Sequence, residues 1–383
     1  MIKALSVFGT RPEAIKMAPV VKKLAENPNF DSKVCVTSQH REMLTPFLEL
    51  FAIQPDFDLN VMRPKQTLTQ LTSNVLTQLE PVLKSFEPDV VLVHGDTTTT
   101  LSATIASYYQ KVPVAHVEAG LRTGDIYLPW PEEANRKLTG GLTRFHFAPT
   151  PLSKENLLKE GVAPKSIHVT GNTVIDALFD VMSQFEANSE LEARMQAQFS
   201  FLDPKRKMVL VTGHRRESFG EGFRQICKAL SMIAKQYPDM DIVYPVHLNP
   251  AVQDVVKPLL GEQDNIYLID PVQYLPFVYL MKHAHIILTD SGGVQEEAPS
   301  LGKPVLVMRD KTERPEAIMA GTVKLVGTKA EPIFDAVKLL VEDSKHYQSM
   351  SRAQNPYGDG EASGRIVSVL QEALAEARVA NPA

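Results

Sequence analysis

The chain has 383 residues, which is more than one ordinary hydrophobic core supports, so we expect two domains. Apolar residues make up 44% and charged residues 22%, the balance of a soluble globular protein, and the formal net charge of −5 argues against a general nucleic-acid-binding protein. The two cysteines, Cys35 and Cys227, provide neither a disulfide framework nor a zinc-binding pattern, which favours the reducing cytoplasm. We find no apolar run long enough for a signal peptide or a membrane span.

Short apolar segments alternate with longer helical patterns along the chain. In the first half these segments cover residues 2–8, 33–38, 89–95, 112–117, 144–149 and 166–171. In the second half they cover residues 207–213, 241–246, 265–270, 285–290, 304–308 and 323–327. Because many are continuously apolar, they are typical of parallel strands that helices cover on both faces. The alternation predicts an α/β fold with right-handed crossovers.

The two halves of the chain begin in the same way. FGTRPE follows the first strand of one half, and TGHRRE follows the first strand of the other. We therefore expect two Rossmann-like domains, residues 1–170 and 171–363, with a final helix at 364–383 that packs back on the first domain. In open parallel sheets ligands bind beyond the carboxyl ends of the strands, so two such domains facing each other would form a cleft there.

The segment TDSGGVQEEA places small residues at a helix start and carboxylates just after it. Ser291, Gly292 and Gly293 would let an anion approach free backbone N–H groups, where the helix dipole also favours negative charge. Glu296 and Glu297 would either complement that dipole or accept hydrogen bonds from neutral hydroxyl groups. A ribose diphosphate satisfies both features, so the segment favours a uridine- or adenosine-like nucleotide.

The segment FGTRPEAIKMAPV lacks the G-x-G-x-x-G pattern, which argues against a nicotinamide cofactor. The chain also has no phosphate-binding loop of the Walker A type, which disfavours simple ATP chemistry. Arg11 and Lys16 are the cations of this segment. They would either contact phosphate or form a solvated basic turn.

Acidic side chains follow strands of the first half. Asp96 follows the strand at 89–95, Glu118 follows the strand at 112–117, and Glu132 lies in the proline-framed segment LPWPEEANR. His214 follows the first strand of the second half. A single histidine in such a place is more often structural, but this set together indicates groups for proton transfer. No close spacing of these residues supports a metal site.

Together these segments resemble the non-hydrolysing UDP-N-acetylglucosamine 2-epimerases. The resemblance runs in order along nearly the whole chain, and its most specific segment is TDSGGVQEEAPSLGKPVLVMRDKTERPEA. The other matching segments are FGTRPEAIKMAPV, SQHREML, HGDTTTT, HVEAGLRT, PEEANR, TGHRRE and NPYGDG. The resemblance implies a glycosyltransferase-B fold, no cofactor, a homodimer, and reversible conversion of UDP-GlcNAc to UDP-ManNAc for cell-surface polysaccharide synthesis.

The resemblance also implies a role for each matching residue. The catalytic residues would be Asp96, Glu118, Glu132 and His214. The nucleotide-sugar contacts would be Arg11, Lys16, Val272, Phe277, Ser291, Gly292, Gly293, Glu297 and Arg314. Among these, Glu297 would hold the ribose, and Val272 and Phe277 would lie near uracil. A second UDP-GlcNAc is implied as an activator near Gln39, His40 and Glu42, where the usual TGQHREML reads TSQHREML in this chain.

The implied reaction explains why several carboxylates are needed. The sugar carbon C2 has no adjacent carbonyl group, so its hydrogen is poorly acidic until UDP leaves and positive charge develops at C1. Anti elimination would then give a 2-acetamidoglucal, and protonation on the opposite face with re-addition of UDP would give the epimer. The helix end at Ser291, with Arg11 and His214, would stabilise the departing diphosphate.

Three other functions fit parts of the pattern. A glycosyltransferase of the same fold would need an acceptor site, and we see no apolar or basic stretch that faces a membrane. A hydrolysing epimerase would release free ManNAc and UDP. A nucleotide-sugar sensor would bind through Ser291–Gly293 and Glu297, but it would not need acidic residues after three strands.

Overall fold

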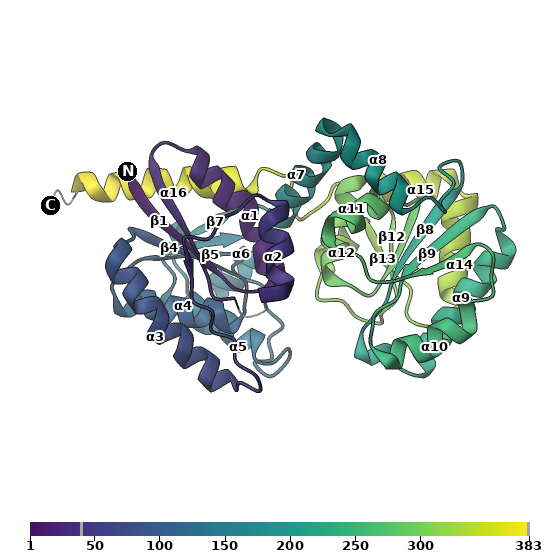
Figure 1. Cartoon of the computed structure of the whole chain (residues 1–383), viewed down its shortest axis with the longest axis horizontal. Helices are drawn as coiled ribbons and strands as arrows, with labels where there is room; N and C mark the ends of the chain where they lie inside the picture. Colours follow the sequence, from purple (N-terminus) through teal and green to yellow (C-terminus); the bar gives the residue numbers. More distant parts are fainter. Residues whose placement is uncertain (39–40, 381–383) are drawn as a thin grey trace. The chain divides into compact units, whose positions relative to one another are not determined.

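The computed structural model describes residues 1–38 and 41–380, and the chain folds into two compact units (Figure 1). The first unit comprises Met1–Asp180 and Tyr357–Ala383, and the second comprises Val181–Pro356. The division falls inside helix α7 (Thr173–Ala187), whereas the sequence placed it after residue 170. The first half of this helix belongs to the first unit because Ile175 and Leu178 are fully buried and Asp176 binds the last helix.

The first unit contains a parallel sheet in the order β3-β2-β1-β4-β5-β6-β7. Its strands are β1 (Ile2–Phe8), β2 (Phe30–Val36), β3 (Phe57–Asp58), β4 (Val90–His94), β5 (Val114–Val117), β6 (Phe145–Ala148) and β7 (Ile167–Val169). The sequence predicted all of these except β3, which has two residues and therefore no apolar run to detect. Every pairing is parallel, so the loops that leave the carboxyl ends gather at one edge.

Helices cover this sheet. They are α1 (Arg11–Glu26), α2 (Arg41–Leu50), α3 (Leu68–Phe86), α4 (Thr98–Tyr109), α5 (Glu132–Leu142), α6 (Pro151–Lys159), the start of α7, and α16 (Ala362–Ala380). The apolar stripe of α3 could have faced either a partner or the interior of its own unit. It faces the interior, because Leu71, Val75 and Leu79 are buried in one cluster with Leu5 and Val91 of the sheet.

The final helix returns to the first unit, where Figure 1 shows α16 beside α1. The buried carboxylate of Asp176 accepts the backbone N–H of Ala362 at 3.2 Å and that of Ser363 at 2.8 Å. Further along, the side chain of Asn27 donates to Gln371 at 2.8 Å. These contacts fix the start and the middle of the helix against α7 and α1.

The second unit repeats the design with the order β10-β9-β8-β11-β12-β13. Its strands are β8 (Lys207–Thr212), β9 (Met240–Pro245), β10 (Ile266–Ile269), β11 (Ile286–Thr289), β12 (Val305–Val307) and β13 (Val323–Leu325), and the sequence predicted each of them. Its helices are α8 (Ser189–Gln198), α9 (Glu221–Gln236), α10 (Pro250–Leu260), α11 (Tyr274–His283), α12 (Gly292–Glu297), α13 (Pro315–Met319), α14 (Ala330–Glu342) and α15 (Ser344–Ser351).

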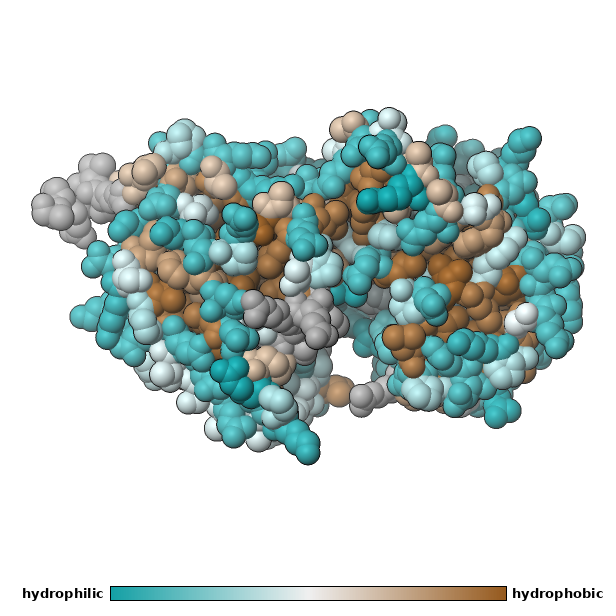
Figure 2. Space-filling view, in the orientation of Figure 1, coloured by the Kyte–Doolittle hydropathy of each residue, from teal (hydrophilic) through white to brown (hydrophobic). Residues whose placement is uncertain are grey.

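Hydrophilic side chains cover much of the face of each unit that Figure 2 presents. Across the described part of the chain, no helix combines the length and the apolar character needed to cross a bilayer. The apolar residues instead fill the two interiors, as the continuously apolar strands predicted.

Two buried histidines make the stability of the first unit sensitive to acid. His116 and His146 are register partners on β5 and β6, and both are about 1% exposed. Burial lowers the pKa of His116 to about 3 and that of His146 to about 4. The His116 Nε2–H donates to the backbone oxygen of Gly95 at 2.7 Å, which acts to raise the pKa, but burial outweighs this bond and keeps the ring neutral.

We expect the urea midpoint to fall as the pH falls from 7 to 4.5. The unfolded chain binds protons on both histidines below pH ~6.5, whereas the folded chain does so only near their lowered pKa values. Each histidine therefore removes about 2 kcal/mol from the unfolding free energy over this interval. In the variant His116→Gln the urea midpoint should fall less over the same pH interval. Circular dichroism follows the unfolding. A midpoint that falls as steeply as in the wild type would contradict the assignment.

Candidate active site

The loop after β1 is held by a buried carboxylate that the sequence did not single out. Glu13 is 1% exposed, and it accepts the backbone N–H of Gly9 at 3.0 Å and that of Thr10 at 2.7 Å. The Thr97 hydroxyl, from the loop after β4, donates to it at 2.7 Å. Burial raises the pKa of Glu13 even though these bonds oppose the rise. One carboxylate thus joins two strand-end loops. Arg11, the residue after Thr10, is exposed, and its guanidinium lies over the Phe47 ring.

Glu118 lies at the centre of a polar cluster after β5. Its φ is +65°, a left-handed conformation that turns the chain sharply at the end of the strand. Lys16 of α1 forms an ion pair with its carboxylate, and Asn172 donates to the same oxygen at 3.1 Å. The His94 ring lies 3.8 Å from that oxygen. The Lys16 side chain is only 12% exposed, so this residue does not belong to a solvated basic turn.

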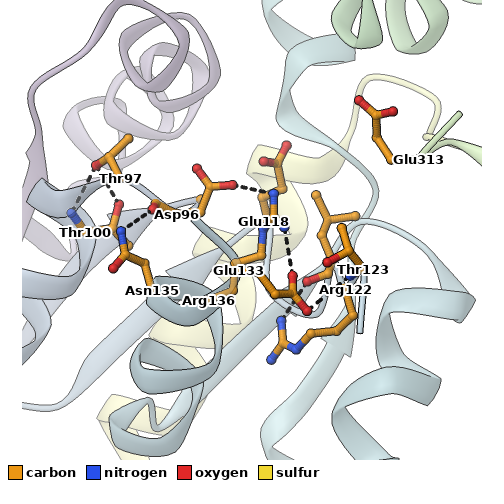
Figure 3. Close-up of polar contacts among 12 residues, drawn as sticks. Asp96, Thr97, Thr100, Glu118, Arg122, Thr123, Glu133, Asn135, Arg136 and Glu313 are labelled. Carbon is orange, nitrogen blue, oxygen red and sulfur yellow. Dashed lines mark hydrogen bonds and ion pairs between the residues drawn. The ribbon is translucent and has the colours of Figure 1, made fainter. Parts of the chain in front are cut away.

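Asp96 is held by a second polar cluster, which Figure 3 shows around Arg136. One Arg136 nitrogen lies 2.6 Å from the Asp96 carboxylate and another lies 2.9 Å from the buried Glu133 carboxylate. Asn135 donates to the backbone oxygen of Asp96 at 2.8 Å. Burial opposes the charge of Arg136, but its two acidic partners outweigh burial and hold its pKa above the usual value. The cation is therefore permanent, and it orients Asp96.

Glu133 also anchors the loop that precedes α5. Its second oxygen accepts the backbone N–H groups of Thr123 and Gly124, each at 3.1 Å (Figure 3). Its neighbour Glu132 is half-buried in the first turn of α5. Within the part of the chain that the structure describes, the Glu132 side chain has no hydrogen bond or ion pair. It therefore differs from Asp96 and Glu118, each of which faces a cation.

The second unit contains a corresponding arrangement at the ends of β8 and β11. Asp290 is fully buried and accepts the backbone N–H of His214 at 2.7 Å and that of Arg215 at 2.8 Å. Its other oxygen lies 3.2 Å from Nδ1 of the His214 ring. Burial acts to raise the pKa of Asp290, but the contacts with His214 and Arg215 outweigh it, and the pKa lies below its usual value.

The segment after Asp290 begins α12, with Ser291 at the N-cap and Gly292 and Gly293 in the first turn. Glu296 and Glu297 lie beyond that first turn, so neither acts as a cap. Both are committed to tertiary contacts that the sequence could not show. Glu296 pairs with Arg314 at 2.5 Å, and Glu297 accepts the Tyr274 hydroxyl at 2.9 Å. An added Cβ at Gly293 would lie 3.5 Å from a Glu297 oxygen, so small residues leave the approach to this carboxylate open.

The residues predicted to contact uracil lie on or just before α11, and those predicted to bind an activator fall outside the described residues. Val272 precedes α11, and Phe277 is half-buried on that helix, which also carries Tyr274. Gln39, His40 and the Glu42 side chain lie outside the described residues. In the first unit Arg11, Asp96 and Glu118 follow strands, Lys16 of α1 contacts Glu118, and Glu132 lies in the first turn of α5. In the second unit His214 and Ser291 follow β8 and β11, Gly292, Gly293 and Glu297 lie on α12, and Arg314 contacts Glu296 of that helix.

Sequence reasoning did not single out the residues that hold these side chains. They are Glu13, Glu133, Arg136, Asn172 and Asp290. The sequence held a partial indication of them. Each lies within four residues of a strand-end loop or in a segment that resembles the family. No group of three or more residues suited to a metal ion occurs among the residues that the structure describes.

Comparison with known proteins now decides the family. The family model described as UDP-N-acetylglucosamine 2-epimerase matches residues 22–371. The UDP-N-acetylglucosamine 2-epimerase of Escherichia coli K12 is 61% identical over 370 residues, which cover 97% of this chain and 98% of the relative. The enzyme of the same name from Yersinia pestis is 62% identical with the same coverage. The chain belongs to the UDP-N-acetylglucosamine 2-epimerase family.

Solved structures of the family agree with this assignment. A Neisseria meningitidis UDP-GlcNAc 2-epimerase bound to UDP-GlcNAc is 53% identical, with a TM-score of 0.89, and the match covers 97% of this chain and all of that one. A Methanocaldococcus jannaschii epimerase in complex with UDP-GlcNAc and UDP is 35% identical, with a TM-score of 0.79 and coverage of 97% and 100%. The expected enzyme class, an isomerase, and the glycosyltransferase-B type of fold are both confirmed.

Arg136 provides a test of the cluster around Asp96. Arg136→Met would leave the fully buried Glu133 without its cation, so we expect a loss of about 3–5 kcal/mol in unfolding free energy. The control is Lys228→Met, which breaks the exposed pair with Glu331 and should cost far less. Denaturant unfolding measures both changes, and equal losses in the two variants would refute the structural role of Arg136.

Proposed function

We propose that the chain interconverts UDP-GlcNAc and UDP-ManNAc by inversion at C2 without hydrolysis. The single observation that supports this most is that Asp96 and Glu118 follow the neighbouring strands β4 and β5, each beside a cation, in a chain that belongs to an epimerase family. Glu132 begins α5, the helix that carries Arg136, the partner of Asp96. Inversion needs one group that removes a proton and another that delivers a proton on the opposite face of the sugar. A set of carboxylates supplies both, whereas a single carboxylate would not.

The sequence of bond changes follows from the chemistry of C2. We propose that the C1–O bond to UDP breaks while a carboxylate removes the C2 proton, which gives UDP and a 2-acetamidoglucal. A proton then returns to C2 on the opposite face, and UDP adds again to C1. No oxidation or reduction occurs, and each proton removed is matched by one returned. General acid–base help of this kind contributes about 10²–10⁴-fold to a rate.

The second unit would hold the nucleotide in this proposal. The backbone N–H groups from Ser291 to Gly293 would face the diphosphate, and Arg314 would lie beside it. Glu297 would accept the ribose hydroxyls, and Val272 and Phe277 would contact uracil. The solved relatives with UDP-GlcNAc and UDP bound support a nucleotide sugar as the ligand class. His214 would stabilise the diphosphate as it departs.

We further propose that the protein works in the cytoplasm as a homodimer and supplies ManNAc units for a cell-surface polysaccharide. A second UDP-GlcNAc would bind as an activator near the segment that contains Gln39, His40 and Glu42. Rate measurements at increasing UDP-GlcNAc concentration would test the activator, and light scattering would test the dimer.

The acidic residues give the first kinetic test. We expect Asp96→Asn, Glu118→Gln and Glu132→Gln each to lower turnover by at least about 10²-fold, because each removes a member of the carboxylate set to which we assign acid–base catalysis. NMR of the nucleotide sugars follows the conversion. Asp180→Asn is the control, since Asp180 pairs with Lys22 at a partly exposed position and should leave turnover unchanged. Near-normal turnover in two of the three acidic variants would overturn the assignment.

The same assay separates the other reactions. Free ManNAc and UDP as final products would indicate a hydrolysing epimerase, and transfer of the sugar to an acceptor would indicate a glycosyltransferase. Tight binding of UDP-GlcNAc with no conversion would indicate a sensor. Each of these outcomes would replace the proposed reaction.

Glu297 gives a separate test of the nucleotide site. Glu297→Gln replaces a charged acceptor with a neutral amide, so we expect UDP to bind about tenfold more weakly or worse. Glu342→Gln is a matched control, because Glu342 also accepts a tyrosine hydroxyl, that of Tyr237 at 2.8 Å, but does so at an exposed position. Calorimetric titration with UDP measures both variants, and similar affinities in the two would remove Glu297 from the site.

A further inference from the structure

His214 does not stand alone after β8, because Asp290 of the neighbouring strand end contacts both its backbone and its ring. We propose that Asp290 is the positioning residue of His214. It holds the neutral ring in the tautomer with the proton on Nδ1, and it leaves Nε2 of the partly exposed ring free of this contact and available to a ligand. The proposal rests on the proposed function only for what Nε2 then contacts, which is the departing diphosphate.

The Asp290 carboxylate is itself fixed in one orientation. The residue is fully buried at the end of β11, and one of its oxygens accepts two consecutive backbone N–H groups, from His214 and Arg215. The other oxygen is therefore the one that faces Nδ1, at 3.2 Å. Because the pKa of Asp290 is held below its usual value, this oxygen can only accept a hydrogen bond at neutral pH. This oxygen is buried and accepts no other hydrogen bond in the described part of the chain, so a proton on Nδ1 is what would satisfy it.

A neighbouring histidine shows the opposite arrangement. His247 stacks on the His214 ring with centroids 5.6 Å apart and planes 20° apart, so it uses neither nitrogen of His214. The backbone N–H of Asn249 donates to Nδ1 of His247 at 3.1 Å, which places the proton of that ring on Nε2. The two stacked rings are thus set in different tautomers by different partners. Stacking alone does not choose the tautomer of His214.

The position of Asp290 in the chain gives this contact a functional consequence. The next residue, Ser291, begins α12, the helix whose glycines we assign to the diphosphate. The histidine and the helix start are therefore held by the same short segment. Any ring proton on Nε2 would be directed to the same ligand group as the helix N–H groups. When the ring is protonated, Asp290 balances its positive charge from the protein side.

Asp290→Asn tests the proposal sharply, because the amide has only one way to fit. Its oxygen must replace the carboxylate oxygen that accepts the backbone N–H groups of His214 and Arg215. Its NH₂ group must then face Nδ1 and donate to it. The neutral His214 ring should move its proton from Nδ1 to Nε2. We expect kcat to fall at least about 10²-fold, while the affinity for UDP changes less than about threefold.

The tautomer is measured by ¹⁵N NMR of histidine-labelled enzyme above pH 8.5, with His214 assigned from the spectrum of His214→Asn. Asp241→Asn is the matched control. Asp241 is also a buried carboxylate of this sheet, 1% exposed, but its partner is Arg206. It should lower stability without moving the His214 proton. Asp290→Glu restores a carboxylate, so it should keep the proton on Nδ1 and retain more activity than Asp290→Asn.

Several results would overturn the proposal. They are a wild-type His214 with its proton on Nε2, an Asp290→Asn variant whose ring keeps the proton on Nδ1, and a kcat loss no larger than that of Asp241→Asn. The wild-type spectrum decides the matter even if Asp290→Asn does not fold. A wild-type enzyme that does not epimerise UDP-GlcNAc would refute the proposed function, yet the tautomer experiment would still stand on its own.

Discussion

Buried carboxylates that accept two consecutive backbone N–H groups hold the strand-end loops of both units. Each of the carboxylates that do so at the candidate site is at most about 1% exposed. The pairs are Gly9 and Thr10 on Glu13, Thr123 and Gly124 on Glu133, and His214 and Arg215 on Asp290. A buried carboxyl group is costly unless hydrogen bonds satisfy it, and each bond contributes about 0.5–3 kcal/mol, most where the group is charged. The loops and the carboxylates therefore fix one another.

This constraint explains how loops can carry reactive groups in defined positions. Loops at the surface are usually the most variable and mobile parts of a fold. Here the backbone is tied to a buried acid immediately beside a residue that we propose to contact the ligand, as with Arg11 after Thr10. Catalysis by acids and bases depends on such prior positioning, since a shift of about 1 Å can cost about 10²-fold in rate. In the proposed reaction the interior acids would therefore position reactive groups without touching the substrate.

Sequence reasoning predicted the strands well because short, continuously apolar runs between helical patterns are typical of parallel strands buried on both faces. It also placed Asp96, Glu118 and His214 just after strands, as the structure has them, while their roles stay a prediction. It did not predict their partners. A glutamate in the first turn of a helix, such as Glu13 or Glu133, is typical of a capping residue, and only the folded chain shows that it is buried and bound to another loop. Nothing in the sequence distinguishes Arg136 from other arginines. Its role depends on its contacts with Asp96 and Glu133, which only the structure shows.

The strongest claim about the reaction is that acidic side chains remove the C2 hydrogen and that a proton from solvent replaces it on the other face. Conversion of UDP-GlcNAc in heavy water, followed by NMR of the products, tests this claim most directly. Removal of the hydrogen predicts UDP-ManNAc with deuterium at C2 and none at C1. UDP-ManNAc that keeps its original hydrogen at C2 would contradict it.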